Sequence, residues 1–219
     1  MPPTFDLLVI GDANPDVIVG PLDSPLAFGQ REQLIDSGAL TLGGSAAITA
    51  CGAARLGLRV AFAGRVGDDG AGHYMRDRLA AHGVDVGALH LDKSLPTPLT
   101  VIVTRGADRA IVAAAAELLA HRVPLVAVKN GADGALCHDG RTLLTTAGVR
   151  VTPVDAVGAG DSFNAGFLAA RLAGRPIAEA LDLAAACGAL STRAAGGTTA
   201  QPTWDEALTH LTANGDTPS

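Results

Sequence analysis

Short apolar runs alternate along this chain with longer segments in which small and apolar residues recur. Residues 5–11 form an apolar run stopped by Gly-Asp, which predicts a buried strand ending in a turn. Residues 46–56 follow a glycine pair and precede Gly57, a pattern typical of a helix with a glycine C-cap. A strand over 59–64 and a helix over 69–82 follow. This alternation predicts an α/β fold with a mostly parallel sheet covered by helices.

The second half of the chain continues this pattern and adds an antiparallel hairpin. Residues 124–128 predict another buried strand, and an Asp-Gly turn joins residues 134–138 to 141–145. Three further helices are predicted over residues 159–172, 177–190 and 204–211. Because the sequence has no internal repeat and no dividing linker, we expect one domain over residues 1–219.

Composition excludes several classes of protein. A chain of 219 residues that is 48% hydrophobic can form one full core. The net charge of −6, without any Lys- or Arg-rich run, argues against a nucleic acid or an anionic membrane as partner. Cys51, Cys137 and Cys187 lie far apart, which argues against a zinc site or disulfides and favours a reducing compartment. No apolar run approaches the roughly 20 residues that span a bilayer. We therefore expect a cytoplasmic protein.

The most informative segment is residues 155–166, Asp-Ala-Val-Gly-Ala-Gly-Asp-Ser-Phe-Asn-Ala-Gly, which places an acid directly after a glycine-rich turn that opens a helix. Gly158, Ala159 and Gly160 let backbone approach an anion, and first-turn N–H groups lack partners inside a helix. Asp161 can take a proton from a substrate hydroxyl while these amides stabilise a transferring phosphoryl group. The alternative is that Asp161 only caps the helix.

The two commonest nucleotide-binding motifs are absent. The sequence contains no G-x-x-x-x-G-K-[ST] P-loop, and no G-x-G-x-x-G follows the first strand. A kinase built on this chain must therefore use another design.

Three more segments accompany residues 155–166: Gly-Asp-Ala-Asn-Pro-Asp at 11–16, Gly-Gly-Ser-Ala-Ala at 43–47 and Gly-Arg-Val-Gly-Asp-Asp at 64–69. In type, order and spacing, the four segments resemble those of the ribokinase-like family of small-molecule kinases, also called the PfkB carbohydrate kinase family. The resemblance implies a ribokinase-like fold, in which helices flank a mostly parallel central sheet and a small β lid covers the substrate. The lid strands are expected within about residues 13–40 and 86–113.

The resemblance implies a role for each segment. Asp161 would be the catalytic base, and Gly158, Ala159 and Gly160 would supply the anion hole. The residues implied to bind substrate are Asn14 and Asp16, for its hydroxyls, and Gly43 and Gly44, for close backbone contact. The alternative for these four is a turn, a strand edge and a helix entry without any ligand.

The resemblance also implies ATP as the phosphate donor, with Mg²⁺ bridging its phosphates and K⁺ at a neighbouring corner. The residues implied on the nucleotide side are Lys129, Asn130 and Gly131. The alternative for the lysine is a solvated surface position. Asp155 and the Val157 carbonyl would bind the monovalent cation, together with carbonyl groups within residues 191–197.

The chain departs from the family pattern at two places. Ile48 stands where the family usually has an asparagine that reaches the sugar, so we expect an altered substrate pocket. Family members are also longer, and several β/α units with an Asn-x-x-Glu motif are missing near residues 113–117. Removing strands leaves their neighbours without ladder partners and apolar faces without cover. We therefore expect a shortened sheet, weak or absent catalysis, and a homodimer as one way to cover the gap.

The leading hypothesis is transfer of the γ-phosphate of ATP to a primary hydroxyl of a sugar, with Asp161 as general base. A nucleoside kinase of the same fold is an alternative, because Ile48 tolerates a less hydroxylated ligand. A remnant that binds a sugar, a nucleotide or another subunit without catalysis is a third hypothesis. The intact Asp161 favours catalysis, whereas the missing Asn-x-x-Glu motif favours the remnant.

Overall fold

A parallel sheet of three strands lies in the N-terminal half of the chain. The computed structural model describes residues 4–19, 37–103 and 125–215. In the order β1-β4-β5, the sheet consists of β1 (Leu7–Ile10), β4 (Val60–Gly67) and β5 (Asp85–Asp92). Both neighbouring pairs run parallel, as the alternation of strand and helix patterns predicts.

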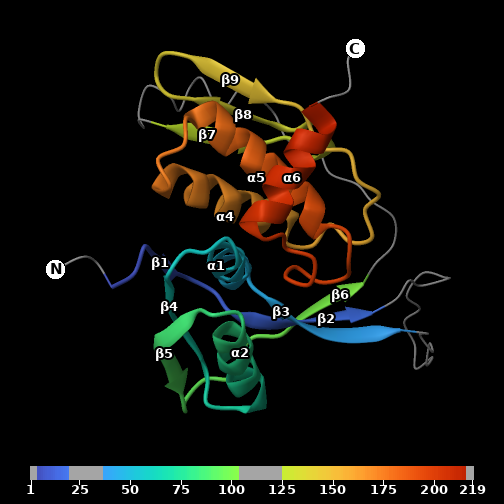
Figure 1. Cartoon of the computed structure of the whole chain (residues 1–219). Coiled ribbons are helices and arrows are strands. Elements are labelled where there is room, and N and C mark those ends of the chain that lie inside the picture. The colour runs from blue at the N-terminus through green and yellow to red at the C-terminus, as the bar shows by residue number, and fades with distance from the viewer. Residues whose placement is uncertain (1–3, 20–36, 104–124, 216–219) are drawn as a thin grey trace.

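A second sheet of three strands is antiparallel and lies beside the C-terminal helices (Figure 1). It is formed by β7 (Val126–Lys129), β8 (Ala135–His138) and β9 (Leu143–Thr146). The hairpin predicted around the Asp-Gly turn is confirmed as β8 and β9. The prediction of a mostly parallel sheet holds for β1, β4 and β5, whereas β7, β8 and β9 are antiparallel.

The third sheet, of order β3-β2-β6, combines β2 (Asn14–Val19), β3 (Gly38–Gly43) and β6 (Thr100–Val103). These strands fall mostly within the ranges predicted for the lid, and their action as a lid stays a prediction. Residues 86–92 were predicted among the lid strands, but they belong to β5, which pairs with β4 because its apolar residues extend the parallel sheet. The predicted lid residues 20–36 and 104–113, and the predicted missing stretch near 113–117, lie outside the described residues.

The five predicted helices are confirmed, with bounds that differ from prediction by at most a few residues. They are α1 (Ser45–Arg55), α2 (Gly70–Ala81), α4 (Ala159–Leu172), α5 (Ile177–Ser191) and α6 (Trp204–Gly215). Among the described helices, none is both long and apolar enough to cross a membrane.

The core joins the two halves of the molecule through α1. This helix lies between α4 on one side and β1 and β4 on the other (Figure 1). Its small residues Ala47, Ala50 and Ala53 are fully buried, which allows the helices to approach closely. The packing therefore brings the starts of α1 and α4, with the two glycine turns, into one region.

Strand β1 has an open edge in the described part of the chain, where it pairs with β4 alone. Leu8 and Ile10 on this strand are 56% and 74% exposed, although a parallel sheet normally carries cover on both faces. Such an uncovered apolar edge is what the loss of neighbouring β/α units predicts.

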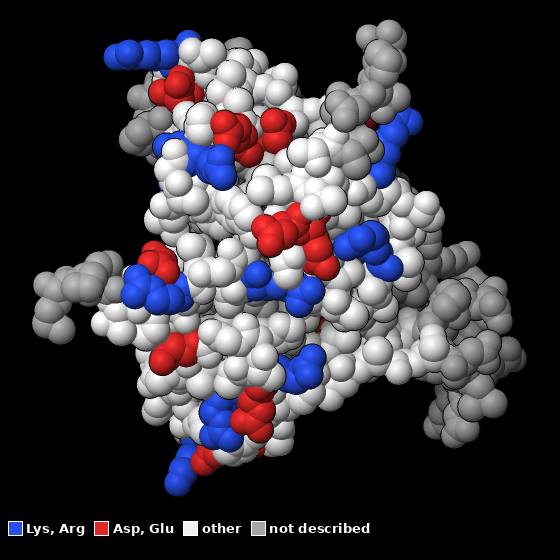
Figure 2. Space-filling view, in the orientation of Figure 1, with Lys and Arg blue, Asp and Glu red and all other residues white. Residues whose placement is uncertain are grey.

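The surface mixes charges of both signs. On the face shown in Figure 2, acidic and basic side chains of the described residues are interspersed. Several form exposed ion pairs, such as Arg59 with Asp6 at 2.6 Å and Arg175 with Glu179 at 3.4 Å. Pairs of this kind contribute about 0–1 kcal/mol each, so the core accounts for most of the stability.

Candidate active site

The N-terminus of α4 presents free backbone amides at the glycine turn. Gly158 is the N-cap and has a φ of 74°, in the left-handed region that glycine adopts most readily. Within the described chain, the N–H groups of Gly158 and Gly160 donate no hydrogen bond, whereas the Ala159 N–H donates to the Ala156 carbonyl at 3.3 Å. Two of the three residues predicted to form an anion hole therefore have amides ready for a ligand.

Asp161 lies in the first turn of α4, directly after these amides. Its carboxylate accepts no N–H of α4, and the N-cap makes no side-chain hydrogen bond, so the capping alternative finds no support. Burial raises the pKa of Asp161 above its usual value, and Asp12 adds to the rise, while Lys129 and the neighbouring Ser45 side chain lower it. A partly buried carboxylate with a raised pKa suits a general base.

The second glycine turn, at Gly43 and Gly44, opens α1. The Asp12 carboxylate accepts hydrogen bonds from the Ser45 N–H at 3.1 Å and the Ala46 N–H at 3.2 Å. Gly44 has a φ of 88°, and a Cβ there would lie 2.8 Å from the Asp12 carbonyl oxygen. The segment after β1 is thus tied directly to the start of α1, a link that the residue pattern around Asp12 does not predict.

Asn14 and Asp16 form a polar pair on β2. The Asn14 Nδ2 donates to Asp16 Oδ1 at 3.0 Å and to Thr100 Oγ1 at 2.8 Å. Asp16 is buried against Gly43, where a Cβ would lie 2.1 Å from the carboxyl carbon. Burial raises the pKa of Asp16, whereas its hydrogen bonds with Thr100 and Asn14 lower it. The pair therefore lies beside the Gly43 turn.

Asp155 ties two loops together at the corner predicted for a cation. Its carboxylate accepts the Val157 N–H at 3.0 Å and the Gly196 N–H at 2.9 Å. The Thr192 carbonyl in turn accepts the Val154 N–H at 2.7 Å and the Asp155 N–H at 3.0 Å. The structure thus brings Asp155 against the segment 191–197, while cation binding there stays a prediction.

Lys129 reaches the α4 turn from the end of β7. Its Nζ donates to the Gly160 carbonyl at 3.1 Å and to Asn164 Oδ1 at 3.2 Å. Asn130 and Gly131 stand at the start of a short 3-10 helix (Gly131–Asp133), and both are exposed. Among the described residues neither forms a hydrogen bond to α4, so of these three the lysine alone is hydrogen-bonded to the glycine turn.

Ile48 proves to be a packing residue. Its side chain is 3% exposed and lies against Gly197, where a Cβ would meet the Ile48 Cδ1 at 2.7 Å. Gly197 in turn lies against Gly158, where a Cβ would meet the Gly197 Cα at 2.6 Å. The Ile48 side chain therefore supports the glycine turn at Gly158 through Gly197. In the sequence, the adjacent glycines at 196 and 197 are the feature that indicates this close packing of Ile48, Gly197 and Gly158.

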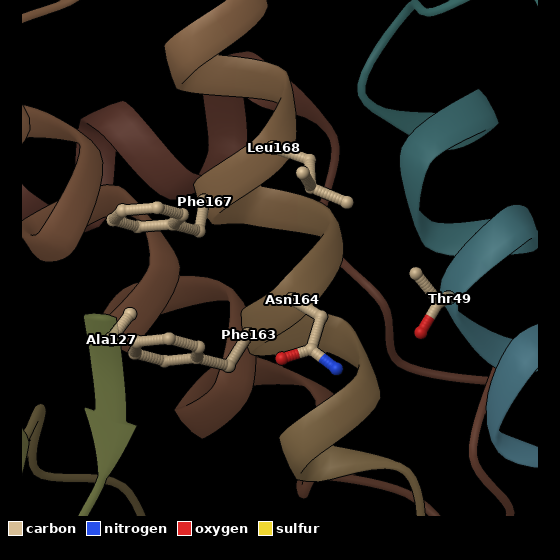
Figure 3. Close-up of a pocket in the computed structure, with 6 residues that line it drawn as sticks. All are labelled: Thr49, Ala127, Phe163, Asn164, Phe167 and Leu168. Carbon is tan, nitrogen blue, oxygen red and sulfur yellow. The ribbon is translucent and has the colours of Figure 1, made fainter. Parts of the chain in front are cut away.

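A cavity of about 270 Å³ lies behind the α4 turn, between α1, β7 and α4. Phe163 and Phe167 have stacked rings with centroids 6.4 Å apart, and in Figure 3 both lie on the side of Ala127 from β7. Thr49 faces α4 from α1, and its Oγ1 donates to the Asp161 carbonyl at 3.4 Å. The cavity thus borders the helix turn that carries Asp161.

The fold and the site together define an α/β protein in which two glycine turns at helix starts surround a partly buried carboxylate. The family model described as pfkB family carbohydrate kinase matches residues 4–117 and 106–204. The chain belongs to this family. The two matched segments overlap around the point where the sequence predicts missing β/α units.

Comparisons with single proteins agree with this assignment. The chain is 41% identical over 92 residues to an ATP-dependent ribose-1-phosphate kinase from Halopiger xanaduensis, a stretch that covers 42% of this chain and 31% of that enzyme. A nucleoside kinase structure from Methanocaldococcus jannaschii has a TM-score of 0.78 at 20% identity, covering 94% of this chain and 97% of that one. Fructokinase from Vibrio cholerae, with fructose, ADP and calcium ion bound, has a TM-score of 0.74 at 23% identity, covering 93% and 98%. The structural neighbours establish the ribokinase-like fold.

Proposed function

We propose that this protein transfers the γ-phosphate of ATP to a primary hydroxyl of a sugar, with Asp161 as the general base. The observation that carries the proposal is the placement of Asp161 directly after the free amides of Gly158 and Gly160. A base and an anion hole on one helix turn are the two groups that phosphoryl transfer to an alcohol needs most.

The substrate side of the proposal rests on the second turn. Asn14 and Asp16 offer an amide and a carboxylate next to Gly43, whose missing Cβ leaves room for the Asp16 carboxyl group. These groups recognise hydroxyls by donating and accepting hydrogen bonds. The similar proteins include kinases named for sugars and kinases named for nucleosides. A nucleoside is therefore the alternative class of substrate.

The donor side needs ATP and Mg²⁺. The amides of Gly158 and Gly160 fit a phosphate group, and Lys129 beside them supplies a positive charge. Among the described residues, no group of three or more His, Cys, Asp or Glu is arranged to hold a metal ion. Mg²⁺ commonly keeps several waters and binds through substrate phosphates, so it would arrive with ATP and neutralise phosphate charge.

A monovalent cation such as K⁺ would fit the corner formed by Asp155 and Val157. Within the described chain Asp155 forms no salt bridge, and its charge acts on the neighbouring Asp16 by raising the pKa of that carboxyl. Carboxylate and carbonyl oxygens are suitable ligands for such an ion. The ion would offset the charge of both carboxylates.

A binding protein with little or no catalysis is the second candidate function. The observation that favours it is the open edge of β1, where Leu8 and Ile10 are exposed, together with the missing Asn-x-x-Glu motif. A sheet that lacks neighbouring units would hold ATP less well than a complete one. Undiminished sugar phosphorylation by the pure protein would exclude this second candidate.

An ADP-release assay coupled to NADH oxidation, run over a panel of sugars and nucleosides, tests the proposal. ADP release that needs one acceptor class and disappears in Asp161→Asn supports the kinase and identifies the acceptor. No ADP release by either protein, with a ligand-dependent rise in melting temperature, supports the binding protein instead. Intact mass of the native protein shows whether the chain is longer than residues 1–219.

Lys129→Met is expected to move the acid limb of the kcat profile to higher pH. The Asp161 carboxylate acts as a base only when deprotonated, and Lys129 lowers its raised pKa. Removing the lysine therefore raises that pKa further, and activity is lost at a higher pH as the solution is acidified. The profile is measured at saturating ATP, because Lys129 would also contact phosphate.

Lys93→Met is the matched control, because Lys93 is exposed in the segment after β5 and is not among the groups that shift Asp161. Its acid limb is expected to coincide with that of the parent. An acid limb that stays in place in Lys129→Met would show that Lys129 does not set the protonation of Asp161.

A further inference from the structure

One buried amide side chain connects the two helices that carry the glycine turns. Gln201 stands between α5 and α6 and is only 1% exposed. Its Nε2 donates to the Ile48 carbonyl on α1 at 3.0 Å and to Ser162 Oγ on α4 at 3.0 Å. A single side chain thus bridges three segments that are far apart in sequence.

The two residues bound by Gln201 occupy equivalent places in their helices. The Ile48 N–H donates to the Gly44 carbonyl at 2.9 Å, and the Ser162 N–H donates to the Gly158 carbonyl at 2.9 Å. Each residue therefore closes the first helical turn on the glycine that starts it. Holding Ile48 and Ser162 together fixes the distance between the two turns.

Access of Gln201 to α1 depends on Gly52. A Cβ at Gly52 would lie 2.9 Å from the Gln201 Nε2 and 3.0 Å from the Ala165 Cβ. A larger residue there would displace either the amide or α4, because both lie against this glycine. The glycine on α1 and the glutamine in the loop thus form one contact.

The orientation of the amide is fixed by its acceptors. Turning it over would place Oε1 against the Ile48 carbonyl, and two acceptors cannot form a hydrogen bond. In the observed orientation Oε1 is buried and has no hydrogen-bond partner among the described residues. An unpaired buried acceptor costs free energy, and this cost offsets part of what the two donated bonds contribute to stability. Its two donated bonds link α1 to α4.

We infer that Gln201 is a positioning residue, which holds the start of α4, with Asp161 and the anion turn, at a fixed distance from the start of α1. Ser162 is adjacent to Asp161, and Ile48 lies four residues after Gly44, so the bridge acts on the base side and the substrate side together. Misplacing reacting groups by about 1 Å can lower a rate by about 10²-fold. The kinetic part of this inference rests on the proposed phosphoryl transfer.

Gln201→Met tests the inference, because methionine keeps the volume and removes both donated bonds. We expect kcat to fall by on the order of 10-fold to 10²-fold, with KM for ATP changed far less and a melting temperature near that of the parent. Ser162→Ala, which removes one bond, is expected to give part of this loss. In the double variant the losses should not add, since both changes break the same bridge.

Hydrogen exchange provides a readout that does not need activity. In Gln201→Met, amides in the first turns of α1 and α4 should exchange about tenfold faster, while those of α5 stay unchanged. Thr146→Val is the control, because it removes a hydrogen bond from Thr146 to Asp182 between β9 and α5. If the parent protein releases no ADP, the proposed phosphoryl transfer is refuted. The hydrogen-exchange data still test whether Gln201 holds the starts of α1 and α4 together. Unchanged exchange in both first turns, or a kcat loss equal to that of Thr146→Val, would overturn the inference.

Discussion

Asp161→Asn is expected to lower kcat by about 10²-fold to 10⁴-fold, the usual contribution of a general base. Asparagine has nearly the same shape as aspartate but cannot accept the proton of the substrate hydroxyl. The free amides of Gly158 and Gly160 remain in the variant, so KM for ATP should change little. Initial rates of ADP release, at saturating ATP and acceptor, measure the effect.

The melting temperature of Asp161→Asn distinguishes a base from a helix cap. Burial raises the pKa of Asp161, so the charged form is disfavoured in the folded protein. At pH 7 the neutral asparagine should therefore leave stability unchanged or raise it, and the difference should shrink as pH falls through the raised pKa. A cap would behave in the opposite way, because its removal lowers stability.

Asp205→Asn is the matched control for this experiment. Asp205 also lies in the first turn of a helix, α6, but it is exposed. We expect kcat in this variant to equal that of the parent. An Asp161→Asn variant that keeps full kcat, with an active parent beside it, would exclude Asp161 as the base.

The sequence predicts the helices and the glycine turn at residues 158–160 well because their signals are local. A glycine at a left-handed position, small residues and a following acid are all contained within residues 155–166, and α4 begins at Ala159 as predicted. The hairpin of β8 and β9 is equally local, since an Asp-Gly turn sets its geometry. In each case the residues that decide the structure are neighbours in the chain.

Sheet membership was harder to predict, because strand partners are distant in sequence. β6 pairs parallel with β2, with Asp16 opposite Thr100, and no short-range pattern indicates that register. β5 was assigned in part to the lid, although it extends the parallel sheet beside β4. Strand composition shows how well a segment fits a sheet, but it does not identify the neighbouring strand.

The supports of the site could not be found from residue type alone. A glutamine in a polar segment predicts a solvated side chain, yet Gln201 is buried between α1 and α4. Ile48 packs against Gly197, which residue type alone does not indicate, and its effect on the substrate pocket stays a prediction. The structural role of both residues is set by tertiary packing, which depends on the whole fold.

The stack of Gly158 on Gly197 gives the second large expected effect. Gly158→Ala places a methyl group on a residue with a φ of 74°, where it would lie 2.6 Å from the Gly197 Cα and 2.8 Å from the Gly197 carbonyl oxygen. These contacts are with backbone, which cannot turn aside as a side chain can. The variant must therefore move the anion turn away from the loop that supports it.

Gly174→Ala is the control that separates the effect of this close contact from the energetic cost of alanine in a left-handed backbone conformation. Gly174 also has a φ of 74°, but a Cβ there would meet nothing within 4 Å. An alanine in the left-handed region costs roughly 1–2 kcal/mol, and an overpacked site adds about 1–3 kcal/mol. At about 2–4 °C per kcal/mol for a chain of this size, both variants melt below the parent, and Gly158→Ala melts lowest.

Activity separates the two variants more sharply than stability does. Gly174 lies past the far end of α4, so Gly174→Ala should retain its kcat at temperatures where it is folded. Gly158→Ala displaces the amides that we propose to hold the phosphate, and a loss of about 10²-fold is expected from a misplaced turn. Circular dichroism melts measure the stability of both variants. ADP release is measured at a temperature 20 °C below the melting temperature of the less stable variant, so that both variants are folded. Equal melting and equal kcat in the two variants would mean that the turn can shift freely, and Gly158 would then matter only for its φ.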